Sequence, residues 1–396
     1  MKVLIVGAGL GALRTAESLR THNYHGEITI VGEEPYFPYN RPPLSKSSLL
    51  EKLHHEELEF KRSENIADVN WIFSDSAVTV EMESKHIVLE SGRHENFDYL
   101  VAATGIRPRR LSIPGSEKEI FTLRNLNHSS ALFAEISKSK KIIIIGAGFI
   151  GCEMAATVRS QGIEVVVVAA DSEPMFVPLG EKLGAAMRER HELHGVTFSM
   201  NATIQSFIGD HRARGVSLAN GLEINGDLVL EAVGSVPNTE WLKSTGIDLS
   251  NGVLVDENMR AKSKDNMPIF AVGDVARYRF DLFDKDPHRI EHWNLPTESG
   301  RRAGESIARL CEGLPLLNTC VDFIPAFWSD QYEYRIQSFG MLHLADRSEV
   351  VAGEMNGPCV VEYLRGDEIV GVVGIDSTPQ LIKYKKEFSA RRIGEK

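Results

Sequence analysis

The same strand-and-turn pattern occurs twice in this sequence, and it limits the possible fold more than any other feature. Residues 1–13 read MKVLIVGAGLGAL, and residues 140–153 read KKIIIIGAGFIGCE. In each copy an apolar run ends in a Gly-x-Gly-x-x-Gly turn, whose glycines allow a tight corner and a close approach of the backbone to a pyrophosphate. A helix that begins there points its free N–H groups at the phosphates. The pattern predicts an α/β protein with two Rossmann-like dinucleotide-binding domains.

The first copy has every part of the dinucleotide-binding pattern. Apolar residues recur at helical spacing after the turn, and the next strand, EITIVGEE, ends at Glu33. An acid about 20 residues beyond the turn is placed to accept a hydrogen bond from a ribose hydroxyl, and a small residue such as Ala12 lets helix and strand pack closely. This context favours nucleotide binding over a glycine turn that serves only a corner.

The second copy lacks the usual acid. Its second strand, IEVVVVAAD, reaches Ala169 where an Asp or Glu is expected, and Asp171 comes two residues later. The site is predicted to bind a dinucleotide with a different ribose contact. Two turns indicate two nucleotides, because a flavin and a hydride donor each carry an adenosine diphosphate.

Length, charge and cysteine content exclude several other classes. A chain of 396 residues is long enough for two or three domains. A net charge of −11 argues against general nucleic-acid binding, and no apolar run reaches the roughly 18 residues of a membrane span. The N-terminus reads as a core strand of a cytoplasmic protein rather than a secretory signal. The four cysteines form no C-x-x-C pair, so neither a metal site nor a redox disulfide is expected.

Further stretches carry a family resemblance. They are YNRPPLSK (39–46), LVAATGIRPR (100–109), IFAVGDVA (269–276) and FWSDQYE (327–333). With the two glycine turns, they resemble the FAD-dependent ferredoxin reductases of bacterial oxygenase electron-transfer chains, the putidaredoxin-reductase-like family. The resemblance runs from Lys2 to about Phe388. It implies a glutathione-reductase-like pair of Rossmann domains followed by a C-terminal α+β domain.

The resemblance also implies a set of FAD contacts. Gly11 and Glu33 are expected at the adenosine, Val78 at the adenine through its backbone, and Arg124 at the phosphates or ribityl chain. Asp274 is expected to accept from a ribityl hydroxyl, with Lys46 and Trp293 beside the flavin ring. The remaining implied FAD residues are Gly7, Gly9, Leu10, Ala12, Arg41, Ala103, Thr104, Gly105 and Gly273.

The second turn is expected to hold the nicotinamide nucleotide through Gly146, Gly148, Phe149, Ile150, Gly151 and Glu153. In the family, an acid at the position of Glu153 pairs with the lysine of PPLSK, so Lys46 and Glu153 are predicted to form the catalytic pair. The alternatives are a helix N-terminal charge and a solvated lysine. Glu173 stands where many relatives carry arginine and is expected to repel a 2′-phosphate, which favours NADH over NADPH.

The implied reaction is hydride transfer from NADH, or possibly NADPH, to FAD. Single electrons then pass to a small ferredoxin, of the 2Fe-2S type, that feeds a cytochrome P-450 or a ring-hydroxylating dioxygenase. The missing cysteine pair argues against glutathione-reductase-like or thioredoxin-reductase-like catalysis, and PPLSK lacks the cysteine of coenzyme A disulfide reductases. Two alternatives stay open, namely a rubredoxin reductase and a redox-responsive flavoprotein of the apoptosis-inducing-factor type.

A basic landing site for an acidic ferredoxin is predicted near Trp328. Arg301, Arg302 and Arg309 share one predicted helix, and Arg302 and Arg309 share a face of it. The C-terminal segment adds Lys383, Lys385, Lys386, Arg391 and Arg392. The alternative is that these are ordinary solvated charges. Relatives of this kind are monomers or weak dimers.

The domain boundaries follow from the motif positions. An FAD-binding domain is expected at 1–112 and 238–314, interrupted by an NAD(P)H-binding domain at 113–237. The crossings are IPGS at 113–116 and GSVPN at 234–238. Residues 315–396 are expected to form the α+β domain.

Overall fold

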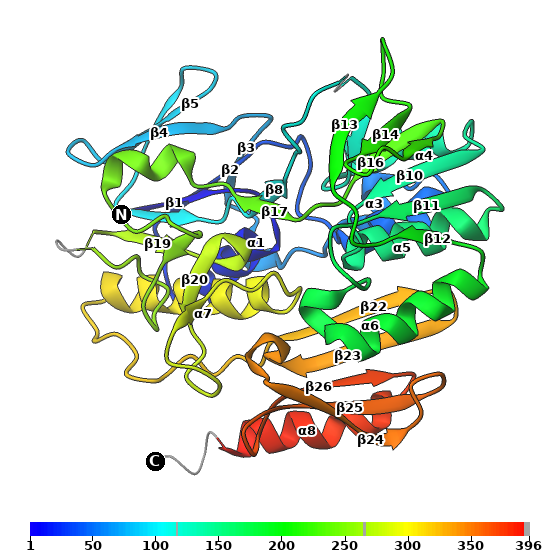
Figure 1. Ribbon diagram of the computed structural model, residues 1–396. Helices are drawn as coiled ribbons and strands as arrows, with labels where there is room; N and C mark the ends of the chain where they lie inside the picture. Colours follow the sequence, from blue (N-terminus) through cyan, green and yellow to red (C-terminus); the bar gives the residue numbers. More distant parts are fainter. Residues whose placement is uncertain (116–117, 264–266, 392–396) are drawn as a thin grey trace.

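The computed structural model describes residues 1–115, 118–263 and 267–391 (Figure 1). Its first parallel sheet has the strand order β19-β7-β1-β2-β3. These strands are β1 (Lys2–Val6), β2 (Glu27–Gly32), β3 (Asn70–Phe73), β7 (Tyr99–Ala102) and β19 (Ile269–Ala271). Every neighbouring pair is parallel. Helix α1 (Leu10–Thr21) joins β1 to β2 by the crossover that a parallel pair requires.

Helix α7 (Leu295–Cys311) packs closely along α1, and glycines allow the approach. A Cβ atom at Gly300 would lie 2.6 Å from the Gly11 carbonyl oxygen, and one at Gly304 would lie 2.6 Å from the Ser18 Cβ. Since neither backbone can yield, only glycine fits at these contacts. This packing fixes the start of α7 against the first glycine turn, where a Cβ atom at Gly11 would lie 3.8 Å from the Pro296 carbonyl oxygen.

The second parallel sheet has the order β12-β11-β10-β16-β9. Its strands are β9 (Ile120–Thr122), β10 (Lys141–Ile145), β11 (Glu164–Val168), β12 (Thr197–Ser199) and β16 (Leu228–Glu231), and its helices are α4 (Leu126–Ile136), α5 (Phe149–Ser160) and α6 (Phe176–Leu193). The apolar faces of β10, β11 and β16 are buried. Such near-continuous apolar strands are typical of a parallel sheet covered on both faces.

Short antiparallel elements connect and flank the two sheets. The chain leaves the first sheet through β8 (Ile106–Pro108) and returns through β17 (Ser235–Pro237), which pair antiparallel. The two boundaries predicted nearby stay predictions. The smaller sheets contain β4 (Ala77–Glu81), β5 (His86–Leu89) and β6 (His94–Asn96), then β13 (Ile204–Ile208), β14 (Gly215–Leu218) and β15 (Glu223–Asn225), and finally β18 (Val253–Leu254), β20 (Ala276–Arg279) and β21 (Pro287–His288).

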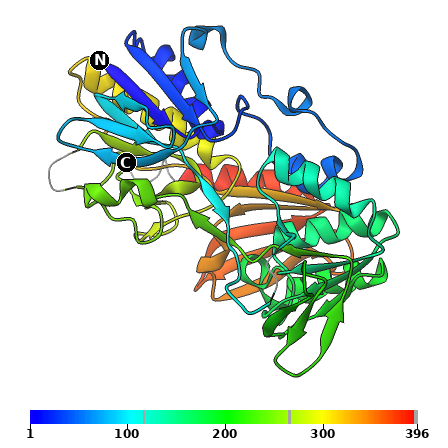
Figure 2. The same ribbon diagram turned by 90° about the horizontal axis from the view of Figure 1, so that it is seen from above.

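The C-terminal sheet is antiparallel, with the order β22-β23-β26-β25-β24. Its elements are β22 (Ala326–Gln331), β23 (Tyr334–Gly340), β24 (Arg347–Gly353), β25 (Cys359–Arg365), β26 (Glu368–Ile375) and helix α8 (Thr378–Arg391). Apolar residues of α6, including Leu183 and Met187, share a buried cluster with Val361 and Val373 of this sheet. Figure 2 shows the two Rossmann-like units as separate lobes with this sheet (orange to red) beside them.

The predicted fold class is confirmed: two dinucleotide-binding units with parallel sheets precede an antiparallel C-terminal unit. Within the described parts of the chain, no helix is both long and apolar enough to cross a membrane.

Candidate functional site

The first glycine turn forms an open cradle at the start of α1. Gly7 has φ +107°, and a Cβ there would lie 2.2 Å from the Ala103 carbonyl oxygen, so the corner requires glycine. Gly9 is the N-cap of α1 and has no side chain to cap the helix, while a Cβ at this position would meet nothing within 4 Å. The free N–H groups of Leu10 and its neighbours therefore face space in which a phosphate fits. Ala12 is buried against the sheet, as predicted.

The end of β2, where Glu33 lies, is next to the start of β4, where Val78 lies. Glu33 follows β2, is exposed, and makes no side-chain hydrogen bond or ion pair within the described residues. The Asp75 N–H donates to the Gly32 carbonyl at 3.1 Å, which brings the start of β4 to the end of β2. A β-bulge leaves Val78 out of the β4–β5 register, with 56% of it exposed. Its backbone is thus available to a ligand, as the predicted adenine contact requires.

Two arginines and an aspartate gather between the first and second units. Arg41 pairs with Glu34 at 2.6 Å and donates to the Arg124 carbonyl at 2.7 Å. Arg124 pairs with Asp274 at 3.3 Å. Burial lowers the pKa of Arg124 and raises that of Asp274, although each charge partly offsets the shift of the other. The cluster thus brings two guanidinium groups, each paired with an acid, to the place where the resemblance puts the phosphates or the ribityl chain.

The segment from Ala103 to Gly105, together with Gly273, shapes the ends of β7 and β19. The Thr104 hydroxyl donates to the Asn238 carbonyl at 2.7 Å, and the Asn238 side chain donates back to the Thr104 carbonyl at 3.0 Å. The Gly273 N–H donates to the Ser299 hydroxyl at 2.9 Å. These groups are committed to the protein itself, so their part in the site is to set the backbone around it.

The second glycine turn repeats the first. Gly146 has φ +102°, and Cβ atoms at Gly146 and Gly151 would lie 2.3 and 2.1 Å from backbone oxygens. Gly148 is the uncapped N-cap of α5, with open space beside it. Ile150 is 48% exposed at the mouth, and the ring of Phe149 lies 4.6 Å from that of Phe327. A second anion fits here.

The second turn has no acidic side chain at the position that corresponds to Glu33, whether that position is taken from the sequence or from the structure. Gly7 donates to the Val31 carbonyl, and Gly146 donates in the same way to the Val168 carbonyl. By this equivalence Ala169 corresponds to Gly32, and Ala170 corresponds to Glu33. Neither alanine can accept a hydrogen bond through its side chain. The structure thus moves the equivalent of Glu33 one residue beyond the position expected from the sequence.

Glu173 is placed differently from the sequence expectation. Its carboxylate is largely buried and lies 3.1 Å from the Arg188 guanidinium of α6. The negative charge that was expected to repel a 2′-phosphate is therefore already paired.

Lys46 and Glu153 meet as predicted, at the junction of three units. The Lys46 Nζ lies 2.8 Å from Glu153 Oε1, and Glu153 is only 7% exposed. Two serines also donate to this carboxylate: Ser45 at 2.5 Å and Ser329 at 2.7 Å. Sequence reasoning missed both serines. Ser329 lies in the FWSDQYE stretch and Ser45 directly precedes Lys46, so each serine belongs to a motif that the sequence analysis had identified.

An aromatic wall stands beside this pair. The rings of Trp293 and Trp328 meet edge to face at 5.6 Å, and the Trp293 Nε1 donates to Asn40 at 3.1 Å. His292 lies 5.2 Å from Phe327, and burial lowers the pKa of His292 to about 4. A neutral imidazole and exposed indole edges suit a planar ligand. His292 was not predicted.

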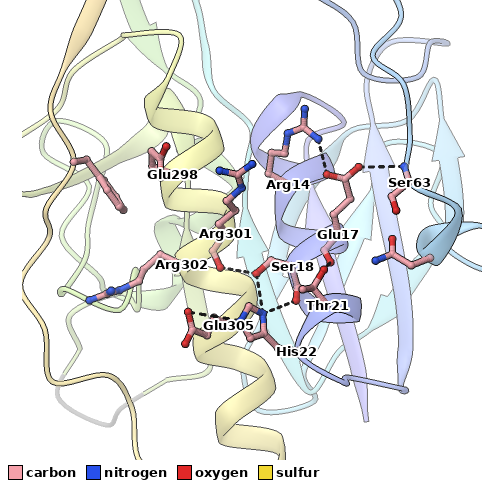
Figure 3. A pocket seen from close by; sticks show the side chains of 12 residues that line it. Arg14, Glu17, Ser18, Thr21, His22, Ser63, Glu298, Arg301, Arg302 and Glu305 are labelled. Carbon is pink, nitrogen blue, oxygen red and sulfur yellow. Dashed lines mark hydrogen bonds and ion pairs between the residues drawn. The ribbon is translucent and has the colours of Figure 1, made fainter. Parts of the chain in front are cut away.

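The predicted partner residues Arg301 and Arg302 separate on α7. Both line a cavity of about 470 Å³ between α1 and α7 (Figure 3). Within the described residues, the Arg301 guanidinium has no hydrogen-bond or ion-pair partner, and the residue is exposed. The Arg302 side chain extends in a different direction from that of Arg301 and donates to the backbone carbonyl of Glu257 at 3.0 Å and to the Thr319 hydroxyl at 2.7 Å. The Arg309 guanidinium likewise binds the Pro315 carbonyl.

Acids interrupt the predicted basic surface. Glu298 and Glu305 line the same cavity as Arg301, at one helical turn on either side of it. Of the C-terminal basic residues, Arg391 pairs with Glu368 and Glu387, and Arg392 lies outside the described residues. On α7 the predicted landing site thus offers one free arginine in mixed surroundings, while Lys383, Lys385 and Lys386 of α8 are exposed and make no ion pair within the described residues.

These observations fit the two nucleotides expected from the sequence. Each glycine turn presents an uncapped helix N-terminus to open space, and each lies beside the Lys46–Glu153 pair or the Arg41–Arg124 cluster. Beside the first turn, the exposed Glu33 carboxylate lies where a ribose acceptor is expected. FAD fits the first cradle, and a nicotinamide nucleotide fits the second.

Comparison with known proteins gives the same picture. The family model for pyridine nucleotide-disulphide oxidoreductases matches residues 1–300, and the reductase C-terminal model matches residues 326–394. Rhodocoxin reductase of Rhodococcus erythropolis is 30% identical over 99% of this chain and 89% of its own length.

Two solved structures are similar throughout. The ferredoxin reductase for the CYP199A2 system from Rhodopseudomonas palustris has a TM-score of 0.88 at 29% identity, covering 96% of this chain and 92% of its own. The covalent putidaredoxin reductase–putidaredoxin complex has a TM-score of 0.89 at 27% identity, covering 98% and 93%. The chain therefore belongs to the pyridine nucleotide-disulphide oxidoreductase family, as an enzyme of the group that contains the putidaredoxin and rhodocoxin reductases.

Proposed function

We propose that this protein is a cytoplasmic, FAD-containing NAD(P)H:ferredoxin reductase that uses NADH in preference to NADPH. Its partner would be a small 2Fe-2S ferredoxin that feeds a cytochrome P-450 or a ring-hydroxylating dioxygenase. The observation that carries the proposal is the Lys46–Glu153 ion pair of 2.8 Å, which lies at the second glycine turn and beside the aromatic wall. Relatives named as ferredoxin reductases are 27% and 29% identical to this chain over 99% of its length.

Bound FAD supplies the redox chemistry, accepting a hydride equivalent and releasing its two electrons one at a time. The protein supplies binding and orientation. The N-terminus of α1, Arg41 and Arg124 balance phosphate charge, while Glu33 accepts from a ribose. The N-terminus of α5 binds the pyrophosphate of the nicotinamide nucleotide. Lys46, held by Glu153, would place a positive charge beside the bound nucleotides.

The chain needs no general base or nucleophile for this chemistry. The described cysteines are free and unpaired with one another, which agrees with a reductase that lacks a redox disulfide. Trp293 and Trp328 form the wall toward which a one-electron partner would dock. Arg301 is the exposed cation on α7 that an acidic ferredoxin would meet.

The test is to measure flavin content and then acceptor specificity of the purified protein. One non-covalent FAD per chain, rapid bleaching by NADH, and NADH-dependent reduction of a 2Fe-2S ferredoxin are expected. Reduction of a rubredoxin but of no 2Fe-2S ferredoxin would replace this proposal with the rubredoxin alternative. Flavin reduction without transfer to either iron protein would favour a redox-responsive flavoprotein.

A further inference from the structure

A row of buried polar side chains leads away from Glu153 into the interface between α6 and β22. The Ser329 hydroxyl contacts Glu153 at 2.7 Å, the Gln331 Nε2 contacts Ser329 at 3.0 Å, and the His191 Nε2 contacts the Gln331 Oε1 at 2.8 Å. Tyr332 closes the row at 3.2 Å from the His191 Nδ1. Ser329, Gln331 and His191 are at most 1% exposed.

Burying such a row of polar side chains costs free energy of folding unless every one of them makes its hydrogen bonds, because each polar group has left water for the protein interior. The side chains around the row are apolar. Met175 and Met187 belong to the buried cluster that α6 shares with the C-terminal sheet, and Phe198 packs edge to face on His191 at 5.7 Å. Apolar residues at these positions would fill the same space. Packing alone therefore does not explain why polar residues occupy these positions.

The direction of the hydrogen bonds follows from the carboxylate. An ionised Glu153 only accepts, so Ser329 must donate its single proton to it and must accept from the Gln331 amide. Gln331 then turns its carbonyl to His191, which must carry its proton on Nε2. The Nδ1 is left to accept from Tyr332. Every donor in the row points toward Glu153.

We propose that Ser329, Gln331 and His191 are positioning residues that hold the Glu153 carboxylate, and through it the Lys46 ammonium, in the arrangement used for hydride transfer. The inference rests on the proposed function, in which that ion pair serves the nicotinamide and flavin rings. Ser329 and Gln331 come from the C-terminal unit, whereas Glu153 and His191 come from the second unit. The row thus makes the geometry of the pair depend on how these two units are docked.

Glu153 is surrounded by few titratable groups. Lys46 faces it from the N-cap of α2 (Ser47–Leu50), and Cys152 adjoins it on α5 with its thiol directed at the Ala147 carbonyl. Burial raises the pKa of the Cys152 thiol, so this group stays neutral. Ser45 and Ser329 supply the other donors. Losing one donor disfavours the ionised carboxylate and leaves its position less fixed.

The chain offers a matched control for the test. Ser338 of β23 is as fully buried as Ser329, and its hydroxyl has no hydrogen-bond partner among the described residues. In the holoenzyme, Ser329→Ala should slow stopped-flow flavin reduction by NADH about tenfold, the typical effect of one hydrogen bond to a charged group. The acid limb of its pH profile should move up by about one unit. Ser338→Ala should change neither.

Equal effects of the two alanine variants, or an unshifted acid limb in Ser329→Ala, would overturn the proposal. Gln331→Met, which keeps the volume but removes the amide, should move the rate and the pH limb in the same direction by a smaller amount. An unchanged rate and pH limb in Gln331→Met would show that the row ends at Ser329.

A second readout does not depend on turnover. Nitrogen-15 NMR of the imidazoles should show His191 as the Nε2–H tautomer, and Gln331→Met should abolish this preference. An Nδ1–H tautomer in the unmodified protein would reverse the row and contradict the proposal. If NADH fails to reduce the flavin at all, the proposed function fails, whereas the NMR result still decides the direction of the hydrogen bonds.

Discussion

Gly9 and Gly148 occupy the same place in the two nucleotide turns, and this allows each turn to be tested against the other. Neither position has positive φ, and a Cβ at either meets nothing within 4 Å. Gly9→Val should therefore fold but lose FAD, because the new side chain fills the phosphate space. Gly148→Val should keep FAD and raise the KM for NADH at least tenfold. Absorbance of the purified proteins and steady-state kinetics measure both. Full FAD occupancy in Gly9→Val would refute the assignment of the first turn.

Glu173 and Arg188 form the ion pair that a 2′-phosphate is expected to meet if NADPH binds at the second turn. Because their side chains are paired at 3.1 Å, removing the acid frees a cation as well as deleting a negative charge. Glu173→Ala should improve kcat/KM for NADPH about tenfold, and Glu173→Arg should improve it further. NADH kinetics should change little. The ratio of kcat/KM values for the two nucleotides is the measurement, and a ratio unmoved by both substitutions would place the phosphate elsewhere.

The residues of the candidate site differ in how well they could be predicted from the sequence alone. Lys46 and Glu153 were predicted from the family resemblance, although they are far apart in the chain. Ser329 and Gln331 could have been noticed, because residues two apart on a strand point to one face. His191 carries no such signal, since its role depends on how α6 docks on β22. Arg301 and Arg302 are neighbours in sequence, yet helical geometry sends them to different surroundings.

The helix α7 combines a buried glycine face with an exposed charged face. Arg301→Glu should reduce ferredoxin-dependent turnover at low ionic strength about tenfold while leaving ferricyanide reduction unchanged, because only the protein acceptor senses a surface charge. Lys138→Glu, in the turn that follows α4 of the second unit, makes the same change in net charge and serves as the control. Equal loss with both acceptors would mean that α7 matters for folding or flavin binding instead.

The elements were predicted best where the pattern is local. The strands and helices that flank the two glycine turns appear as expected, because apolar runs and helical spacing specify them directly. The pairing of β8 with β17 and the β-bulge at Val78 depend on contacts between distant segments. The hydrogen bonds from Arg302 and Arg309 of α7 to the 312–319 segment also depend on the tertiary fold, so the local sequence does not predict them.

The whole molecule should become less stable in mild acid. Burial lowers the pKa of His191 to about 4, whereas an unfolded histidine titrates near 6.5. The unfolded chain therefore binds more protons between these values, and stability falls as the pH drops from about 6.5 to about 4. The full effect for this residue is on the order of 3 kcal/mol. Thermal unfolding across this range measures it, and His191→Gln should flatten the profile. An equal slope in the variant would assign the effect to other groups.

The interrupted first sheet has a consequence for how the chain is made. All five strands of the second sheet lie between residues 120 and 231, whereas the first sheet needs β19, which pairs with β7 from about 170 positions downstream. During synthesis from the N-terminus, the second unit can finish while the first still exposes the free edge of β7. Closing so long a loop is slow, and an open strand edge invites misassociation in the meantime. The second unit can therefore fold before the first is complete, and the sheet that carries the first glycine turn can be completed only after the residues as far as 271 have been made.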